Sequence, residues 1–262
     1  MKVSNRVENI FAHAVALDQS GGMKNTVYAL DREIFILNYD HTILLRFRLR
    51  DSEKPFKDPI SFRANDYDSS KFYEENGKIV FETEKGGYVR KKSCGTPGMT
   101  PEDVKELFDS YSTPEGESLT ISKSVLSLLD ENLSHIEFSA DEDGPLNMVQ
   151  RNVYSGAIIE ISPKEAGLSG VHKFENAFGP IGLRTADFMG LFSFQDSLIF
   201  TFALDSSADD EENMGNGFIL AESLDKKKMD MQALVACCLY DEIIEIKEAK
   251  NGREKSKIRR SK

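Results

Sequence analysis

The sequence predicts an α+β protein with two similar domains, each built of antiparallel sheets with short helices on one face. Three observations predict this fold class. Strand-like runs outnumber helix-like runs several-fold, and most connections between strands are short, which favours hairpins over crossovers. A unit of strand, short helix and further strands also occurs more than once, which indicates duplicated supersecondary units. We place the domains at residues 1–113 and 114–249, followed by a basic tail at residues 250–262.

The first domain begins with a predicted amphipathic helix. Residues 3–18 repeat apolar side chains at helical spacing, and a Gly-Gly pair follows as a helix stop. Residues 42–49 alternate Leu and Phe with Arg, the pattern of a half-buried strand. Thr100 and Pro101 predict the start of a second helix, which runs to about Tyr111, because Thr is a good N-cap and Pro suits the first turn. Further strands are expected at residues 25–30, 33–39, 59–64, 78–84 and 87–93.

The second domain repeats this kind of layout. It opens with a strand at residues 117–121 and a short amphipathic helix at residues 122–133. A similar pattern follows later, with a strand at residues 180–183 and a helix at residues 184–194. Between the two, residues 162–179 are predicted to be a connection. Other strands are expected at residues 135–141, 145–150, 154–162, 197–205, 217–223 and 231–240, with an acidic loop at residues 206–217.

The charge of the chain is strongly uneven. The sequence has 33 Lys and Arg against 44 Asp and Glu, a formal net charge of −11. The tail carries seven basic residues and one acid, so its net charge is +6 and that of the remaining chain is −17. An acidic body excludes a protein that coats nucleic acid with its whole surface, but it leaves room for a local basic strip. The tail fits either a solvated, disordered spacer or a segment that contacts phosphates.

The cysteines and the apolar runs predict a cytoplasmic protein that is not embedded in a membrane. Three cysteines cannot form a disulfide framework, which indicates a reducing compartment. No apolar run reaches the roughly 18 residues of a membrane span, and the N-terminus lacks the pattern of a signal peptide.

The sequence carries no motif of a catalytic, cofactor or metal site. It has no GxxxxGKS/T or GxGxxG loop for phosphates and no GxSxG nucleophile turn. Its four histidines are scattered without metal-ligand spacing. The acidic loop lacks the spaced carboxylates of a calcium loop, so a solvated loop is the simpler interpretation. We therefore expect no enzyme activity, no cofactor and no metal.

Residues 117–161 resemble the half-domain unit of DNA sliding clamps of the proliferating-cell nuclear antigen type. The shared pattern is a strand, a helix with a leucine-rich face, a strand that ends in an acidic glycine turn, and two further strands. Residues 31–49 resemble the hairpin of the same unit, with Asp40 and His41 at its turn. Residues 51–116 fit less well, so the second helix of the first domain must be the one at residues 101–111. The compact size suggests a divergent member, of viral or phage type.

The resemblance implies a function without catalysis. Clamps of this family have two similar domains per chain and three chains per ring, with an outer β layer and helices around a hole that holds duplex DNA. The expected function is therefore that of a DNA polymerase processivity factor. Its expected partners are duplex DNA, bound without regard to sequence, a DNA polymerase and a clamp loader, and its expected assembly is a homotrimer.

A sliding ring must hold duplex DNA through its phosphates, so it needs Lys and Arg on the polar faces of its inner helices. Basic residues on or near the predicted helices are the candidates. A plainer interpretation fits most of them equally well, in which single basic side chains only solubilise a helix. The candidate DNA-facing residues are Lys2, Arg6, Lys105, Lys123, Arg184, Lys226, Lys227 and Lys228.

The resemblance also implies a partner-binding site. Clamps bind short peptide motifs of polymerases in an apolar groove beside the connection between domains. In this sequence we expect that connection near residues 162–180, which offer Leu168, Val171, Phe174 and Phe178 as groove residues. The other interpretation is that these side chains anchor the connection to the core.

A second function class remains open at this stage. A non-catalytic phage or bacterial structural or assembly subunit, which forms a ring or a tube, would also be acidic, free of catalytic motifs and rich in sheet edges that pair between copies. A clamp needs a one-sided basic strip across several helices, whereas a structural subunit does not.

Overall fold

The computed structural model describes residues 4–17, 25–67, 71–76, 78–85, 88–94, 98–112, 116–152, 157–161, 173–175, 177–203, 218–227 and 229–237. The strands of this described part form three sheets, of eight, four and three strands. All of their pairings are antiparallel, as the short connections predicted. No helix among the same residues is long and apolar enough to cross a membrane.

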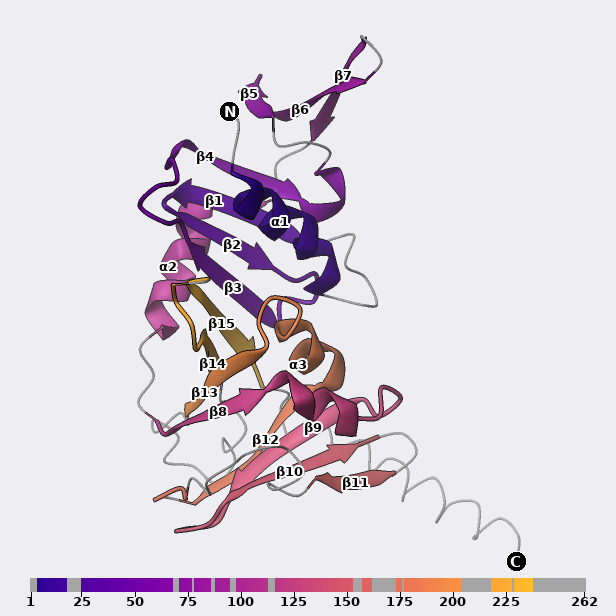
Figure 1. Ribbon diagram of the computed structural model, residues 1–262, viewed down its shortest axis with the longest axis vertical. Coiled ribbons are helices and arrows are strands. Elements are labelled where there is room, and N and C mark those ends of the chain that lie inside the picture. The colour runs from indigo at the N-terminus through magenta and orange to yellow at the C-terminus, as the bar shows by residue number, and fades with distance from the viewer. Residues whose placement is uncertain are drawn as a thin grey trace, which may run out of the picture.

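The described residues of the first half of the chain form seven strands and two α-helices (Figure 1). The helices are α1 (Asn5–His13) and α2 (Pro101–Tyr111), and α1 continues into the 3-10 turn η1 (Ala14–Leu17). The strands are β1 (Thr26–Asp31), β2 (Glu33–Leu37), β3 (Ile43–Arg48), β4 (Phe56–Arg63), β5 (Phe72–Glu75), β6 (Lys78–Lys85) and β7 (Tyr88–Cys94), with the 3-10 turn η3 (Ala64–Asp66) after β4.

The second half consists of two interleaved copies of one unit. The first copy is β8 (Ser118–Ser122), η4 (Lys123–Leu128), β9 (His135–Ala140), β10 (Leu146–Arg151) and β11 (Ile158–Ile161). The second copy is β12 (Phe178–Arg184), α3 (Thr185–Leu191), β13 (Ser197–Ala203), β14 (Phe218–Ser223) and β15 (Met231–Ala236). Strand β8 pairs with β13 of the second copy, and β12 pairs with β9 of the first. The recurrence predicted from the sequence is therefore confirmed.

The eight-stranded sheet joins the two halves of the chain. Its order is β4-β1-β2-β3-β15-β14-β13-β8, so the last strand lies beside the third (Figure 1). At the junction Leu45 is paired with Ala233 and Phe47 with Met231, and all four side chains are fully buried. Arg46 is paired with Gln232 between these two pairs and donates to its side chain, and a slip of one residue would separate these buried polar groups, so this contact favours the observed register.

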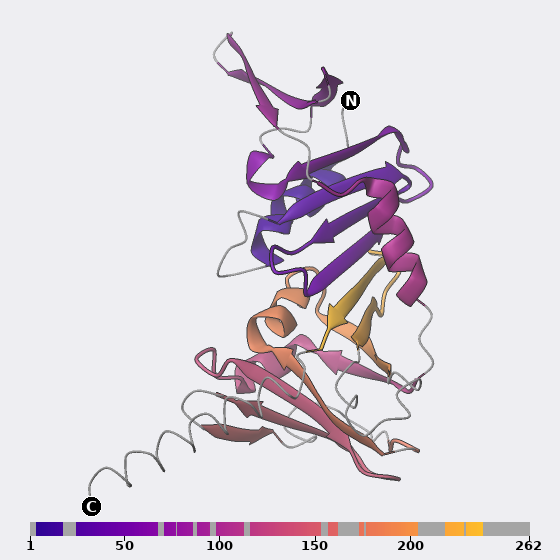
Figure 2. The ribbon, with the colours of Figure 1, turned by 180° about the vertical axis from the view of Figure 1, so that it is seen from behind.

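Both faces of this sheet are covered by helices. Ile34 and Ile36 of β2 belong to the main core, on the face that α1 and α3 cover. Phe35 and Leu37 alternate with them and pack on the opposite face, where α2 lies (Figure 2). Helices α1 and α3 thus share one face, as predicted, whereas α2 covers the other, because the central strands are apolar at successive positions.

Helix α2 begins where the sequence predicts. Thr100 is its N-cap and accepts a hydrogen bond from the Asp103 amide, while the Asp103 carboxylate accepts one from the Thr100 amide. Pro101 occupies the first helical position. This reciprocal capping satisfies two backbone donors that a helix start otherwise leaves open.

The helix predicted at residues 122–133 is shorter than expected. Only Lys123–Leu128 are helical, in a 3-10 conformation. Serine side chains compete for backbone groups there, since Ser122 accepts from the Ser124 amide and Ser127 donates to the Ser124 carbonyl. Asp130 then forms a turn by accepting from the Asn132 amide. Local polar contacts therefore replace the second half of the predicted helix.

The contact between α3 and η1 predicts a sensitive position. A Cβ atom built on Gly190 would lie 2.7 Å from the Leu17 carbonyl oxygen, so one backbone segment must move if the side chain grows. We expect Gly190→Ala to lower the free energy of unfolding by about 1–3 kcal/mol, the usual cost of overpacking. Urea unfolding followed by circular dichroism measures the change. Gly98→Ala is the matched control, because nothing lies within 4 Å of a Cβ atom at that position. Equal stability of the two variants would contradict the close contact.

Candidate partner-binding groove

Helix α2 is attached to the sheet by a small apolar cluster. Val104 and Phe108 of the helix are fully buried against Tyr28, Phe35 and Leu44 of the first three strands. Leu220 and Leu234, from β14 and β15, complete the same cluster. The helix therefore contacts side chains from both halves of the chain and covers the sheet close to the β3–β15 junction.

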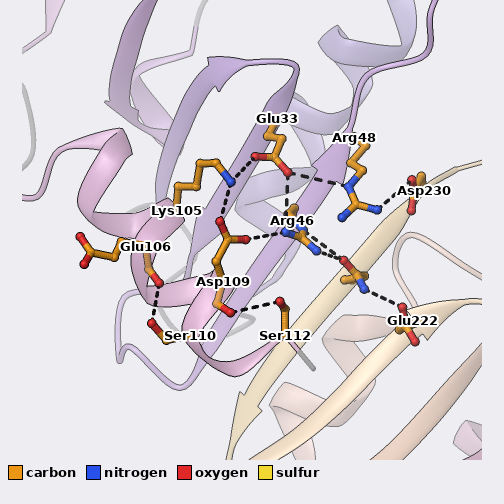
Figure 3. A network of polar contacts seen from close by, with 11 residues as sticks. Glu33, Arg46, Arg48, Lys105, Glu106, Asp109, Ser110, Ser112, Glu222 and Asp230 are labelled. Carbon is orange, nitrogen blue, oxygen red and sulfur yellow. Dashed lines mark hydrogen bonds and ion pairs between the residues drawn. The ribbon is translucent and has the colours of Figure 1, made fainter. Parts of the chain in front are cut away.

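The buried side chain of Arg46 holds α2 through Asp109, beside the apolar cluster (Figure 3). The Arg46 side chain is 5% exposed, and its Nη1 lies 2.9 Å from Asp109 Oδ1 of α2 and 3.6 Å from Glu33 Oε1 of β2. Its Nε and Nη2 donate to Gln232 Oε1 of β15. The guanidinium carbon lies 4.3 Å from the centroid of the Phe108 ring. One cation thus ties α2 to strands from the two ends of the chain.

Further charges extend this network over the sheet surface. Lys105 Nζ lies 2.5 Å from Asp109 Oδ2 and 3.2 Å from Glu33 Oε2, and the hydrogen bond with Asp109 raises the pKa of Lys105. Gln232 Nε2 donates to Glu222 of β14. Burial lowers the pKa of Arg46, but a guanidinium stays charged in any case, and Asp109 and Glu33 compensate that charge.

An apolar groove of about 260 Å³ lies beside α2 at the junction of the two halves. Leu44 and Leu234, which are paired across β3 and β15, contribute to its lining. Leu107 and Tyr111 of α2 contribute as well, and they are 42% and 50% exposed. The remaining lining residues are Leu37, His41, Thr42, Met99, Phe218 and Ala236. The groove can therefore accept apolar side chains from solvent.

A polar cluster connects the rim of the groove to α3. Arg184 donates to Asp187 through Nε and Nη2, at 2.8 and 2.9 Å, and also to Asp40 and Thr42 of the β2–β3 turn. The Thr42 hydroxyl donates to Asp187 in turn. Burial opposes the charge of Arg184, but Asp187 and Asp40 outweigh it and raise its pKa. This cluster holds the second half of the chain against the turn that lines the groove.

The structure does not bring the predicted DNA-facing residues into one strip. Arg6 of α1 forms an ion pair of 2.7 Å with Glu53, and Arg184 is held by the cluster at Asp187. Lys105 belongs to α2, the helix on the sheet face opposite α1. Lys123 is exposed on η4, whereas Lys226, paired with Glu222, and Lys227 lie in the β14–β15 turn. Lys2 and Lys228 are outside the described residues.

Two of the four predicted partner-binding residues, Phe174 and Phe178, are described by the structure, and neither lines the groove. Phe174 and Phe178 are buried, with ring centroids 5.1 Å apart, and both contact Phe202 of β13. They anchor the segment before β12 to the core. Leu168 and Val171 lie outside the described residues. Sequence reasoning missed the groove itself, although Leu107 and Tyr111 form a second apolar stripe on α2 beside Val104 and Phe108.

Neither a metal site nor a cluster of catalytic type is visible in the described part of the chain. No group of three or more His, Cys, Asp or Glu residues in that part could hold a metal ion. The perturbed charges just described are paired within structural networks. The groove therefore presents apolar side chains beside charges that are already paired, an arrangement suited to binding a partner.

Solved structures of sliding clamps share this fold. No protein-family model and no curated protein matches the sequence. The PCNA2–PCNA3 complex from Sulfolobus tokodaii matches with a TM-score of 0.52 at 10% identity, over 88% of this chain and 95% of that chain. The DNA polymerase III beta subunits of Pseudomonas aeruginosa and Streptococcus pneumoniae match with TM-scores of 0.55 at 11% identity, over 88% of this chain. The match spans 64% and 63% of those two subunits. The chain therefore has the sliding-clamp fold, as the resemblance implied.

The arginine network predicts a large effect from one substitution. Arg46→Ala leaves Asp109 and Glu33 without their shared cation and removes the contact with Phe108, so we expect a loss of about 3 kcal/mol of unfolding free energy. Arg48→Ala is the control on the same strand. Its side chain is 46% exposed, so we expect a change of at most about 1 kcal/mol. Urea unfolding measures both, and hydrogen exchange of α2 amides should rise only in the first variant. Similar losses in both would contradict the central place of Arg46.

Proposed function

We propose that the chain is a DNA polymerase processivity factor, without catalytic activity of its own, whose copies assemble into a homotrimeric ring around duplex DNA in the cytoplasm. The ring would tether a DNA polymerase to its template and would be placed there by a clamp loader. The sliding-clamp fold supports this proposal. The observation that carries it is that β7 and β11 lie at sheet edges where the structure describes no further strand, and that each ends a meander as β3 and β15 do.

The described strands include four comparable antiparallel meanders, each of three consecutive strands. The last strands of these meanders are β3, β7, β11 and β15. Strands β3 and β15 pair with each other and create the eight-stranded sheet. Strands β7 and β11 lie at the edges of the three-stranded and four-stranded sheets, and no described strand pairs with their outer sides. The same pairing between β7 of one copy and β11 of the next would join copies head to tail, which closes a ring if the rotation fits.

The two edges are chemically complementary. Tyr88 and Val89 of β7 are exposed. Ile158 of β11 is also exposed, at 52%. Strand β7 also presents an exposed Lys91, and β11 presents an exposed Glu160. Apolar contact and opposite charge therefore favour β7 with β11 over either strand with itself. An edge of this kind is expected to be covered in the working assembly.

Such a ring would place α1, η4 and α3 on one surface and α2 on the other. We propose that the helix surface faces the DNA, with Lys123 among its contacts. Arg6 and Arg184 already have carboxylate partners, so their attraction for phosphates is reduced. Tethering would then depend on encirclement more than on charge. The groove beside α2 would lie on the opposite surface, where it can hold a peptide segment of a polymerase or loader by its apolar side chains.

The proposed ring predicts the mass of a trimer and predicts that a charge on the β11 edge separates its subunits. We expect light scattering to give about three times the 29.4 kDa of the chain, and negative-stain images of the same peak to show a ring with a central hole. Ile158→Asp should convert it to monomers, because a charge on the β11 edge opposes pairing. Leu224→Asp is the matched control, since Leu224 is 56% exposed but lies outside both edges. A monomeric parent protein, or a long tube, would contradict the proposal, and the tube would favour a structural subunit.

Encirclement predicts that DNA binding depends on DNA topology. The protein is first diluted until it dissociates and is then concentrated with a relaxed circular plasmid, so that rings which re-form can close around the duplex without a loader. We expect the protein to remain with the circular plasmid at 0.5 M salt, an ionic strength we choose so that the Debye length falls to about 4 Å and ionic contacts are weak. A single restriction cut should release it, because a ring slides off an end. Gel filtration of the plasmid measures retention, and retention unchanged by the cut would contradict encirclement.

A further inference from the structure

The last strand of the chain ends at the groove beside α2. Ala236, the final residue of β15, contributes to the lining of the groove, and its amide donates to the Thr42 carbonyl at 2.8 Å. Thr42 lines the same groove. A further 25 residues follow Cys237, from position 238 to position 262. The chain therefore leaves the sheet at the rim of the groove, and residues 238–262 begin beside it.

The composition of this segment complements the groove. Residues 239–246 have the sequence LYDEIIEI, in which three isoleucines, a leucine and a tyrosine are interspersed with three acids, and the groove is lined mainly by apolar side chains that the five apolar and aromatic residues match. An extended chain spans about 3.3–3.6 Å per residue, so these eight residues reach up to about 28 Å. That length allows the segment to turn back from Ala236 and lie against Leu107 and Tyr111.

Charge supports the placement of the basic end of the tail beside α2, although residues 238–249, with four acids and one lysine, have a net charge of −3. The exposed side of α2 carries Glu102 and Glu106, and the helix has four acids against one lysine. Residues 250–262, which follow the apolar stretch, carry a net charge of +6. Opposite charges on the tail and on the helix attract each other, and this attraction weakens as salt increases.

From these observations we infer that the C-terminal segment of the chain, residues 238–262, occupies the groove beside α2 when no partner is bound. The inference rests on the proposed function, because it takes the groove beside α2 to be the site where a partner peptide binds. A segment attached at the rim has an effective concentration of the order of millimolar, so a weak contact is enough to fill the groove. A partner peptide must then displace the tail, which limits binding to partners of higher affinity.

Photo-cross-linking in the full-length protein tests the inference. p-Benzoylphenylalanine in place of Leu107 puts the photoreactive group on the wall of the groove, and the same residue in place of Leu224 is the control at an equally exposed apolar site. We expect tryptic mass spectrometry to find Leu107-site cross-links to residues 238–262 and few from the control. A mixture of ¹⁵N-labelled and unlabelled chains separates cross-links within one chain from those between copies.

Two further variants keep the test decisive. Ile243→Asp with Ile244→Asp should reduce the cross-link yield roughly tenfold, because charged side chains do not enter an apolar groove. Exchanging the basic residues of positions 250–262 for Glu should reduce it by about fivefold through repulsion from α2. Circular dichroism melts confirm that both variants fold. Cross-links only between copies, yields equal to the control site, or yields unaffected by both variants would each overturn the inference. The measurement uses dilute protein without DNA, so it can fail or succeed independently of the ring and encirclement experiments.

Discussion

The pairing of β3 with β15 is the constraint on which the rest of the structure depends. It joins a strand near the start of the described chain to the last described strand and makes one sheet out of two halves. The buried side chains of Arg46 and Gln232 meet across this pairing, and their hydrogen bond favours one register without any covalent link. The groove, the Arg46 network and the cluster at Arg184 all lie along this junction, and each contains residues from both halves. Separating the strands would remove all three.

Helix α2 both stabilises the sheet and lines the groove. Its buried side, Val104 and Phe108, closes an apolar cluster on the sheet, and Asp109 receives the buried charge of Arg46. These anchors leave Leu107 and Tyr111 half exposed at the edge of the groove. A rigidly held helix presents such side chains in a fixed geometry, which lowers the entropy that a binding partner must lose. The contacts of Arg46 that hold α2 in place therefore also affect how tightly the groove can bind a partner.

The charges of the protein show why basic residues alone are a weak guide to nucleic-acid contacts. Arg6, Lys105 and Arg184 were all candidates on sequence grounds, and each has a carboxylate within 2.8 Å. A paired side chain gains less from a phosphate, because it must first give up its partner. In a body of net charge −17 such pairing is the expected outcome. A ring of the proposed kind would tolerate this pairing, since topology and not affinity would retain it on the duplex.

The sequence by itself determined the local elements and the fold class. Alternating Leu and Arg at residues 42–49 marked a strand, and Thr100 with Pro101 marked the start of α2, because these signals act over a few residues. The recurring unit was visible for the same reason, and it carried the resemblance to sliding clamps. Only the tertiary structure decided that α2 lies opposite α1, that Arg46 is buried, and that an apolar groove lies beside α2 with neither Phe174 nor Phe178 in its lining. Those features depend on pairing between strands more than 180 residues apart, and periodicity within a strand carries no information about which distant strand lies beside it.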